Sequence, residues 1–566
     1  MLFTPTPEPP MTLHLYDTTL RDGTQREGLS LSVEDKVKIA GALDRLGVSY
    51  IEGGWPGSNP KDADFFRRIR EVPLLRARIA AFGSTRRPGI RCEDDANLHA
   101  LLAAETPVVT IVGKSSTLHV DRVLETTRSE NLRMIAESVA FLARAGREVI
   151  YDAEHFFDGC ALDRDYALAT LEAAASAGAA CVVLCDTNGG TLPDTVRDGV
   201  ALVREWIATP VGIHPHDDAG LAVANALAAV QAGSVHVQGT INGYGERCGN
   251  LDLVPLIATL QLKLGIPVVP PESLRRLTEA SQYVAEVANQ HPDPHAPYVG
   301  RSAFAHKGGI HVAAVAKVPD SYQHVEPSEV GNQMRVVVSE VSGRRTVRMR
   351  AEALGLTAGG MEAGVLERIK ELEHQGFQFE AAEGSFEMLI RRSAPGYRAP
   401  FVLEDFTVIV EKRGGNGTRS QATVKMRVGG TAMHTAAEGD GPVNALDRAV
   451  RKALLPHYPA LADVHLVDYK VRIVDEHLGT AARPRVIIES ARGADRWSTV
   501  GCSDNIIEAS WLALCDGLEL ALLRSAAPGT AEAGPAFSSD QGPGQPKYHQ
   551  TSVTPSPRPP DERAVS

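Results

Sequence analysis

Short apolar runs alternate with amphipathic segments through the first half of the chain. Each run is four to six residues long, and the segments between the runs repeat their apolar residues at helical spacing. The expected strands are residues 13–17, 49–53, 79–82, 107–112, 148–152, 181–185, 210–213 and 235–240. The expected helices include residues 33–46, 131–145, 166–177, 193–206, 221–232 and 251–264. Eight strand–helix alternations in about 250 residues predict an α/β fold, a (β/α)8 TIM barrel.

The ends of the helical segments support this division. Ser32 begins the first helix and Asp35 follows three residues later, an arrangement related to the capping box. No G-x-G-x-x-G motif follows an expected strand, so a dinucleotide-binding sheet is not favoured. Several helices stop at a glycine, the usual residue for a left-handed helix end, at Gly47, Gly146, Gly178, Gly233 and Gly265.

The second half leaves this rhythm and contains an internal repeat. Residues 403–410 match residues 466–473, and each copy continues with two strand-like runs and a helix, at 443–455 and 505–523. Two such βββα units predict an α+β regulatory or plain dimerisation domain. We expect a barrel at 12–270, helical linker subdomains at 271–390 and the repeat domain at 391–525. Residues 1–11 and 526–566, rich in Pro, Gly or Ser, are expected to be disordered.

Composition narrows the class of protein. A net charge of −12 argues against nucleic-acid and anionic-membrane partners, which require a basic surface. Seven scattered cysteines without a C-x-x-C pair fit reduced thiols. No run approaches the ~20 apolar residues of a membrane span. We expect a cytoplasmic protein.

Chemically competent side chains follow nearly every expected strand. In a TIM barrel, the residues just past the strands line one catalytic face. Convergence of so many ionisable groups at that face indicates a binding site. These residues are Arg21, Asp22, Glu52, Ser84, Lys114, Glu154, His155, Asp186, Thr187, Asn188, His214, His216, Asn242, Glu246 and Asn250.

A metal site is the strongest candidate among them. His214 and His216 project from one face of a strand because they are two residues apart. With Asp22 they supply three ligands, and Asn250 adds an oxygen; this set suits Zn, Mn or Co, or Mg with waters. A histidine pair alone is more often only hydrogen-bonded at a strand end. Such a cation can chelate a 2-oxo acid and polarise its carbonyl.

Arg21 and Thr187 are candidates for substrate contact. Arg21, next to Asp22, is placed to stabilise charge on a keto oxygen; the alternative is a salt bridge to Glu52 or Glu154. Thr187 can bind a substrate carboxylate, although a threonine at a strand end is usually a helix cap.

Three motifs resemble the 2-isopropylmalate synthase, homocitrate synthase and citramalate synthase family. They are LYDTTLRDGTQ at 15–25, GIHPHDDAG at 212–220 and GTINGYGERCGN at 239–250. EGGWPG at 52–57, YDAEHFFDG at 151–159 and CDTNGGTLP at 185–193 most resemble the citramalate synthase branch. The resemblance spans residues 12 to 525. One departure is Asp217, where the family usually has Asn; we expect this carboxylate to lie outside the ligand set.

The resemblance implies a Claisen-type acyltransferase (EC 2.3.3 type) that joins acetyl-CoA to a 2-oxo acid and then hydrolyses the thioester. It assigns the metal to Asp22, His214 and His216, with Asn250 close by. It also implies that Arg21 polarises the keto group, that Thr187 contacts substrate and that Glu154 belongs to the acid/base set. His311 and Tyr322, packing or capping residues on sequence alone, become candidates for proton transfer at the acetyl-CoA methyl group. The base stays open between His311 and Glu154.

The branch implies pyruvate as the oxo acid, citramalate as the product and a role in isoleucine biosynthesis. It further implies a homodimer with isoleucine as effector. The alternatives are 2-isopropylmalate or homocitrate synthesis from another 2-oxo acid, an acyl-CoA lyase on a related barrel and a non-catalytic amino-acid sensor. A lyase needs a reactive cysteine, for which Cys248 is the candidate at the barrel mouth.

Overall fold

The computed structural model describes residues 13–307, 309–315, 317–337, 344–353, 360–412, 417–474, 482–493 and 495–525. They form two compact units, the first made of the described residues up to Val337 with 344–346, and the second of the described residues from Val347 to Ser525. The expected disorder at 1–11 and 526–566 concerns residues outside the described set. No helix among the described residues is long and apolar enough to cross a membrane.

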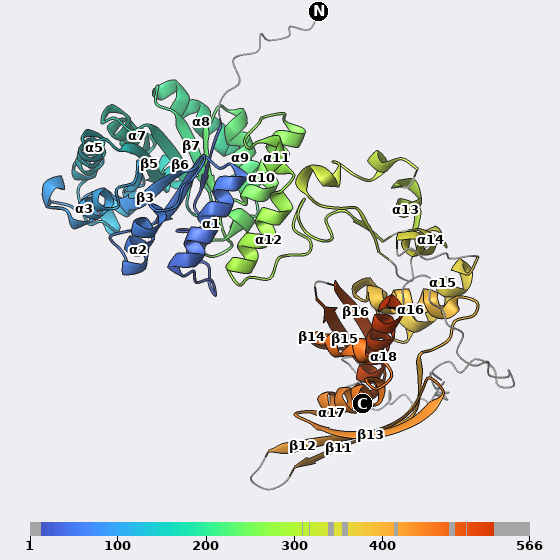
Figure 1. The fold of residues 1–566 in the computed structure, drawn as a ribbon. Coiled ribbons are helices and arrows are strands. Elements are labelled where there is room, and N and C mark those ends of the chain that lie inside the picture. Colours follow the sequence, from blue (N-terminus) through green and yellow to red (C-terminus); the bar gives the residue numbers. More distant parts are fainter. Residues whose placement is uncertain are drawn as a thin grey trace, which may run out of the picture. The chain divides into compact units, whose positions relative to one another are not determined.

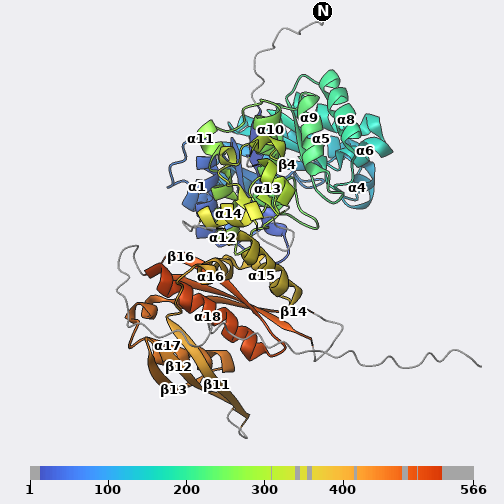
Figure 2. The ribbon, with the colours of Figure 1, turned by 90° about the vertical axis from the view of Figure 1, so that its right-hand side faces the viewer.

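Eight parallel strands close into a barrel in the first unit, as predicted (Figures 1 and 2). Their order follows the chain, and the last strand pairs with the first: Leu15 lies opposite Val237. Each expected strand overlaps an observed one. The strands are β1 (His14–Asp17), β2 (Tyr50–Gly54), β3 (Arg78–Ser84), β4 (Val108–Lys114), β5 (Glu148–Glu154), β6 (Cys181–Asp186), β7 (Val211–Pro215) and β8 (His236–Gly239).

Helices cover the outside of this ring of strands. The first helix has the bounds that its sequence predicts, because Ser32 and Asp35 form both hydrogen bonds of a capping box and Gly47 ends the helix at φ 100°. The principal helices are α1 (Val33–Leu46), α2 (Pro60–Ile69), α3 (Ala96–Ala103), α4 (Thr117–Arg122), α5 (Arg128–Arg144), α6 (Phe156–Leu162), α7 (Arg164–Ser176), α8 (Pro193–Trp206), α9 (Ala222–Gln231), α10 (Leu253–Lys263), α11 (Pro271–Leu274) and α12 (Leu277–Val287).

The barrel interior is partly polar. Beside apolar side chains such as Val183, it buries Tyr16, Glu52, Asp152 and Gln238. Tyr16 donates its hydroxyl proton to Glu52 Oε2 at 2.6 Å. Buried polar groups need hydrogen-bond partners, and these residues obtain them from side chains on other strands inside the barrel.

A short segment of the first unit follows the barrel. It holds a two-stranded parallel sheet of β9 (Ala305–His306) and β10 (Arg335–Val336), the helix α13 (Gly309–Val315) and the 3-10 helix η4 (Pro319–Ser321).

The second unit contains the two predicted βββα repeats. The first consists of β11 (Phe401–Lys412), β12 (Thr418–Val428), β13 (Thr431–Gly439) and α17 (Pro442–Leu454). The second consists of β14 (His465–Ile473), β15 (Pro484–Arg492), β16 (Asp495–Cys502) and α18 (Ile506–Ser525). Each forms an antiparallel three-stranded sheet, and the first strand of each shifts register at the matching place, after Leu403 and after Leu466. Helices α14 (Arg344–Ala353), α15 (Glu362–His374) and α16 (Glu383–Ser393) precede the repeats.

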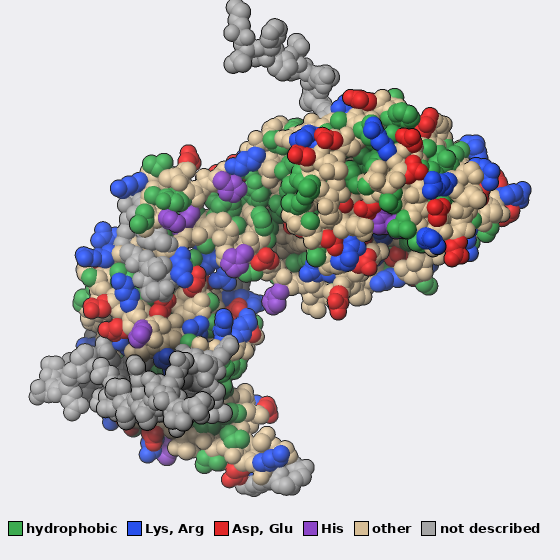
Figure 3. Space-filling model, turned by 180° about the vertical axis from the view of Figure 1, so that it is seen from behind, with side chains coloured by type: hydrophobic (Ala, Val, Ile, Leu, Met, Phe, Trp, Pro, Cys, Tyr) green, Lys and Arg blue, Asp and Glu red, His purple; other side chains and the backbone are tan. Residues whose placement is uncertain are grey.

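Charges of both signs are interspersed on the molecular surface. On the face shown in Figure 3, acidic and basic side chains of the described residues lie among one another rather than in separate fields.

Candidate metal and substrate site

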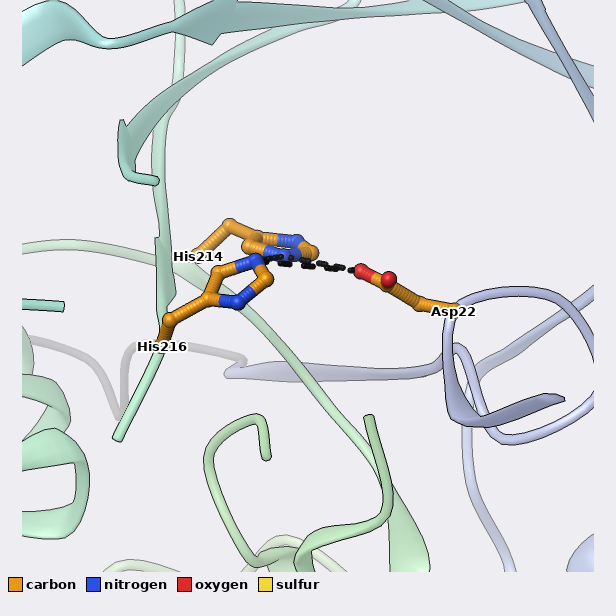
Figure 4. Close-up of side chains that lie close together, drawn as sticks. All are labelled: Asp22, His214 and His216. Carbon is orange, nitrogen blue, oxygen red and sulfur yellow. Dashed lines mark hydrogen bonds and ion pairs between the residues drawn. The ribbon is translucent and has the colours of Figure 1, made fainter. Parts of the chain in front are cut away.

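Asp22, His214 and His216 converge at the carboxyl ends of the barrel strands, as predicted (Figure 4). His214 lies on β7 and His216 follows directly after the strand, and Asp22 follows β1 at the start of the 3-10 helix η1 (Gly23–Gln25). The His214 Nε2 atom lies 3.3 Å from Asp22 Oδ2 and 3.3 Å from His216 Nε2. One possible ligand atom from each residue lies within 4.8 Å of the others. All three side chains are buried, so they form a compact donor set.

Asn250 joins this group from the loop after β8. Its Nδ2 atom donates to Asp22 Oδ2 at 2.9 Å. Its Oδ1 atom is buried and has no hydrogen-bond partner. A buried acceptor without a partner is costly, and a bound cation is one way to satisfy it. Asn250 therefore lies beside the other three residues, and its role as a further ligand stays a prediction.

The charges of the donor set suit a divalent cation. Burial works against ionisation of Asp22, but Arg21 and the two imidazoles hold its pKa well below the usual range. Burial and the neighbouring His214 lower the pKa of His216 to about 4. Burial also disfavours protonated His214, yet the hydrogen bond and charge of Asp22 raise the pKa of His214. A carboxylate that attracts positive charge beside neutral imidazole nitrogen is the chemistry of a metal site.

Arg21 is held from three sides. Its Nε atom donates to Glu52 Oε1 at 2.5 Å, and its Nη1 atom lies 3.5 Å from Asp22 Oδ1. Its guanidinium carbon lies 3.7 Å from the ring centroid of Phe82. Burial disfavours the charge, but the carboxylates of Asp22 and Glu52 raise the pKa of Arg21 further above its usual value. The alternative salt bridge to Glu52 therefore exists, and it orients Arg21 rather than removing it from the site.

One cavity of about 390 Å³ joins these groups. Trp55 and Phe82 form an apolar part of its wall, with ring centroids 5.5 Å apart. The predicted residues that line it are Arg21, Asp22, Ser84, Lys114, Glu154, Thr187, His214, His216 and Glu246. The cavity has the size of a small-molecule site, and most of the residues that line it are polar or charged.

Thr187, directly after β6, and Glu154, the last residue of β5, face the cavity. The Thr187 hydroxyl oxygen accepts a hydrogen bond from the His155 backbone N–H at 2.9 Å, which leaves its own proton free to donate. Glu154 forms an ion pair with Lys114 at the end of β4.

Arg247 is a residue whose place the sequence did not reveal. It donates to both carboxylate oxygens of Asp218, at 2.7 and 2.8 Å, and to the Thr187 carbonyl at 2.8 Å. Its Nη2 atom lies 3.3 Å from His216 Nδ1. Arg247 thus ties together the loops after β6, β7 and β8. The only signal for it was its position between Glu246 and Asn250.

His311 and Tyr322 are not among the residues lining the cavity. Their rings stack on each other with centroids 4.3 Å apart, and both side chains are exposed. Their role in proton transfer stays a prediction. Asp217 caps α9 by accepting from the Ala222 backbone N–H at 2.8 Å.

Comparison with known proteins covers most of the chain. The HMGL-like family model matches residues 12–284, the homocitrate synthase post-HMGL domain-like model 298–376, and the LeuA allosteric (dimerisation) domain model 380–522. An (R)-citramalate synthase of Synechocystis sp. is 52% identical over 526 residues, which cover 90% of this chain and 96% of that protein. The (R)-citramalate synthase of Geobacter sulfurreducens is 50% identical over 515 residues, with 90% and 98% covered. A probable 2-isopropylmalate synthase of Methanopyrus kandleri is 32% identical over 511 residues, again with 90% and 98% covered.

Proposed function

The chain belongs to the family of the (R)-citramalate synthases, and we propose that it condenses acetyl-CoA with pyruvate and water to give (R)-citramalate and CoA. The observation that carries this function is the convergence of Asp22, His214 and His216 beside Arg21 in one cavity. The difference between 52% and 32% identity favours citramalate over 2-isopropylmalate as the product. The lyase alternative is not favoured, because the relatives at 48–52% identity are synthases.

Asp22, His214 and His216 would hold the divalent cation, with the amide oxygen of Asn250 as a further ligand. Two imidazoles and a carboxylate accept Mn²⁺, Zn²⁺ or Co²⁺, and Mg²⁺ when waters complete its shell. When bound, such a cation supplies Lewis acidity to the keto group of the oxo acid.

Arg21 and Thr187 would orient the oxo acid. The keto oxygen gains negative charge as the new carbon–carbon bond forms, and the fixed guanidinium of Arg21 can stabilise it without moving. The Thr187 hydroxyl has a free proton to donate to the substrate carboxylate. Trp55 and Phe82, which form an apolar part of the cavity wall, would contact the pyruvate methyl group.

A base must remove a proton from the acetyl-CoA methyl group so that this carbon can attack the keto carbon. Glu154 faces the cavity and forms an ion pair with Lys114. His311 and Tyr322 remain the other candidates for this proton transfer. The alkoxide then takes up a proton, and water cleaves the thioester to release CoA as the free thiol.

The second unit would regulate this reaction. Its match to the LeuA allosteric (dimerisation) domain supports a homodimer. Isoleucine is the expected effector, because citramalate feeds isoleucine biosynthesis in this branch. The cytoplasm, where such substrates occur, is the proposed location.

A thiol-release assay tests the function directly. Acetyl-CoA is supplied with pyruvate, 2-oxobutyrate, 2-oxoisovalerate or 2-oxoglutarate, with and without a chelator. Turnover should be greatest with pyruvate and should vanish with the chelator until Mn²⁺ is restored. Preference for 2-oxoisovalerate would instead identify a 2-isopropylmalate synthase. If none of the four oxo acids supports thiol release, the synthase function is contradicted.

A further inference from the structure

Gln238 lies inside the barrel, directly behind His214. The two residues stand on adjacent strands, β8 and β7, and Asp152 faces them from β5. The His214 Nδ1 atom lies 2.6 Å from Gln238 Oε1. The Gln238 Nε2 atom donates to Asp152 Oδ1 at 2.9 Å. The three side chains are between 0 and 5% exposed, so they depend on one another for hydrogen bonds.

The surroundings decide which end of the Gln238 amide faces His214. The amide nitrogen lies against two acceptors, the Asp152 carboxylate and, at 3.4 Å, the His236 Nε2 atom. Burial lowers the pKa of His236 to about 3, so this imidazole is neutral and can accept a hydrogen bond. Burial raises the pKa of Asp152 to about 7, and its ionised form and the His236 Nε2 atom are the acceptors. In the reversed orientation, the amide oxygen would oppose both acceptors and lose both hydrogen bonds. Unpaired buried polar atoms are costly, so the oxygen must face His214.

The amide oxygen in turn decides which nitrogen of His214 carries the proton. An oxygen acceptor 2.6 Å from Nδ1 requires a proton on that nitrogen. In the neutral ring the lone pair is then on Nε2, the atom that faces Asp22 and His216. Histidine ligands bind metals through a nitrogen lone pair, and the partner of the other nitrogen sets which one is available.

We propose that Gln238 is a positioning residue that selects the metal-binding tautomer of His214, and that Asp152 holds Gln238 in the required orientation. This role rests on the proposed function of the Asp22, His214 and His216 site. It extends the site to two residues that are not themselves candidate ligands.

The test compares Mn²⁺ affinity, measured by calorimetry on the full-length protein, in three variants. Gln238→Leu removes both hydrogen bonds at nearly constant volume, and we expect a loss of affinity of about 10–100-fold. Gln238→Glu keeps an acceptor toward His214 Nδ1 and should bind Mn²⁺ more tightly than Gln238→Leu. Ser234→Ala is the matched control, because its buried hydroxyl bonds only the Val211 and His236 carbonyls on the same strands. Its affinity should equal that of the wild type.

The Co²⁺ absorption spectrum provides a second readout, because its ligand-field bands report the arrangement of the ligands rather than the stability of the fold. Gln238→Leu should alter the ligand-field bands, whereas Ser234→Ala should not. A folded Gln238→Leu protein with wild-type affinity and spectrum would overturn the role of Gln238. If this variant does not fold, Asp152→Asn replaces it: weaker Mn²⁺ binding supports the arrangement, and unchanged binding contradicts it. Failure of the wild type to bind Mn²⁺ would instead overturn the metal site itself.

Discussion

Arg21 combines three contacts that lysine cannot reproduce together: a hydrogen bond to Glu52, proximity to Asp22 and a stacked position on Phe82. Arg21→Lys keeps the charge but loses the planar fork. We expect kcat to fall by about 10²–10³-fold, the usual cost of losing one oxyanion donor. Mn²⁺ affinity should change little, since Arg21 is not a ligand.

Steady-state kinetics with pyruvate and calorimetry with Mn²⁺ separate these two effects. Arg26→Lys is the control, because Arg26 also lies over an aromatic ring, that of Tyr244, but does not line the cavity. Arg21→Lys with wild-type kcat would show that its guanidinium has no part in the reaction.

Arg247 makes a second residue-scale prediction. Its bidentate bond to Asp218 and its bond to the Thr187 carbonyl hold three loops at the mouth. Arg247→Gln should therefore weaken Mn²⁺ binding by about 10-fold, as substitutions around metal ligands commonly do. Arg204→Gln removes a surface arginine that bonds only the Ala232 carbonyl and should leave binding unchanged. Equal Mn²⁺ affinity in both variants would argue against the tie between the loops.

The loop after β8 shows how backbone shape places a ligand. A Cβ atom on Gly245 would lie 1.9 Å from Asn250 Oδ1, so no larger residue fits without moving Asn250. Gly245→Ala should lower Mn²⁺ affinity, with the fold retained. Gly190→Ala is the matched control, because its added Cβ would meet no atom within 4 Å. Calorimetry and circular dichroism on both variants distinguish ligand displacement from unfolding.

The capping box of α1 tests an element outside the site. Ser32→Ala removes the acceptor for the Asp35 backbone N–H, a bond of 3.2 Å. Loss of such a cap costs about 1 kcal/mol of stability. Urea denaturation should show this decrease in the first unit, while kcat with pyruvate should remain that of the wild type. A fall in kcat would mean that α1 affects the site.

At the scale of the whole molecule, the two units have separate hydrophobic cores. One core spans the barrel from Leu13 to Val330, and others lie within residues 347–521. We expect calorimetry to show two unfolding transitions. Mn²⁺ should raise the midpoint of the barrel transition and isoleucine that of the other, because a ligand stabilises the unit that binds it. A ligand at 100 times its Kd adds about 2.7 kcal/mol. Isoleucine without effect on either transition would contradict its role as effector.

The sequence by itself determined the barrel and the repeat, because local apolar periodicity and glycine residues at helix ends, such as Gly47, predict both. It also determined the centre of the site, because the carboxyl ends of barrel strands meet at one mouth. Asp22 and His214 could therefore be placed together although they are 192 positions apart in the chain. The roles of His311 and Tyr322 came from family resemblance alone and stay predictions.

Only the tertiary structure decided which groups support the site. Phe82 and Gln238 lie outside the family motifs, and Arg247 lies within one that does not reveal its role. Each acts through a partner on another strand or loop. In the sequence, Gln238 reads as an ordinary strand residue. Only the closed barrel places it between Asp152 and His214, with a hydrogen bond to each. Such contacts depend on register and side-chain direction across the barrel, which periodicity along one strand does not contain. The ligands could therefore be named from the chain, but what orients them could not.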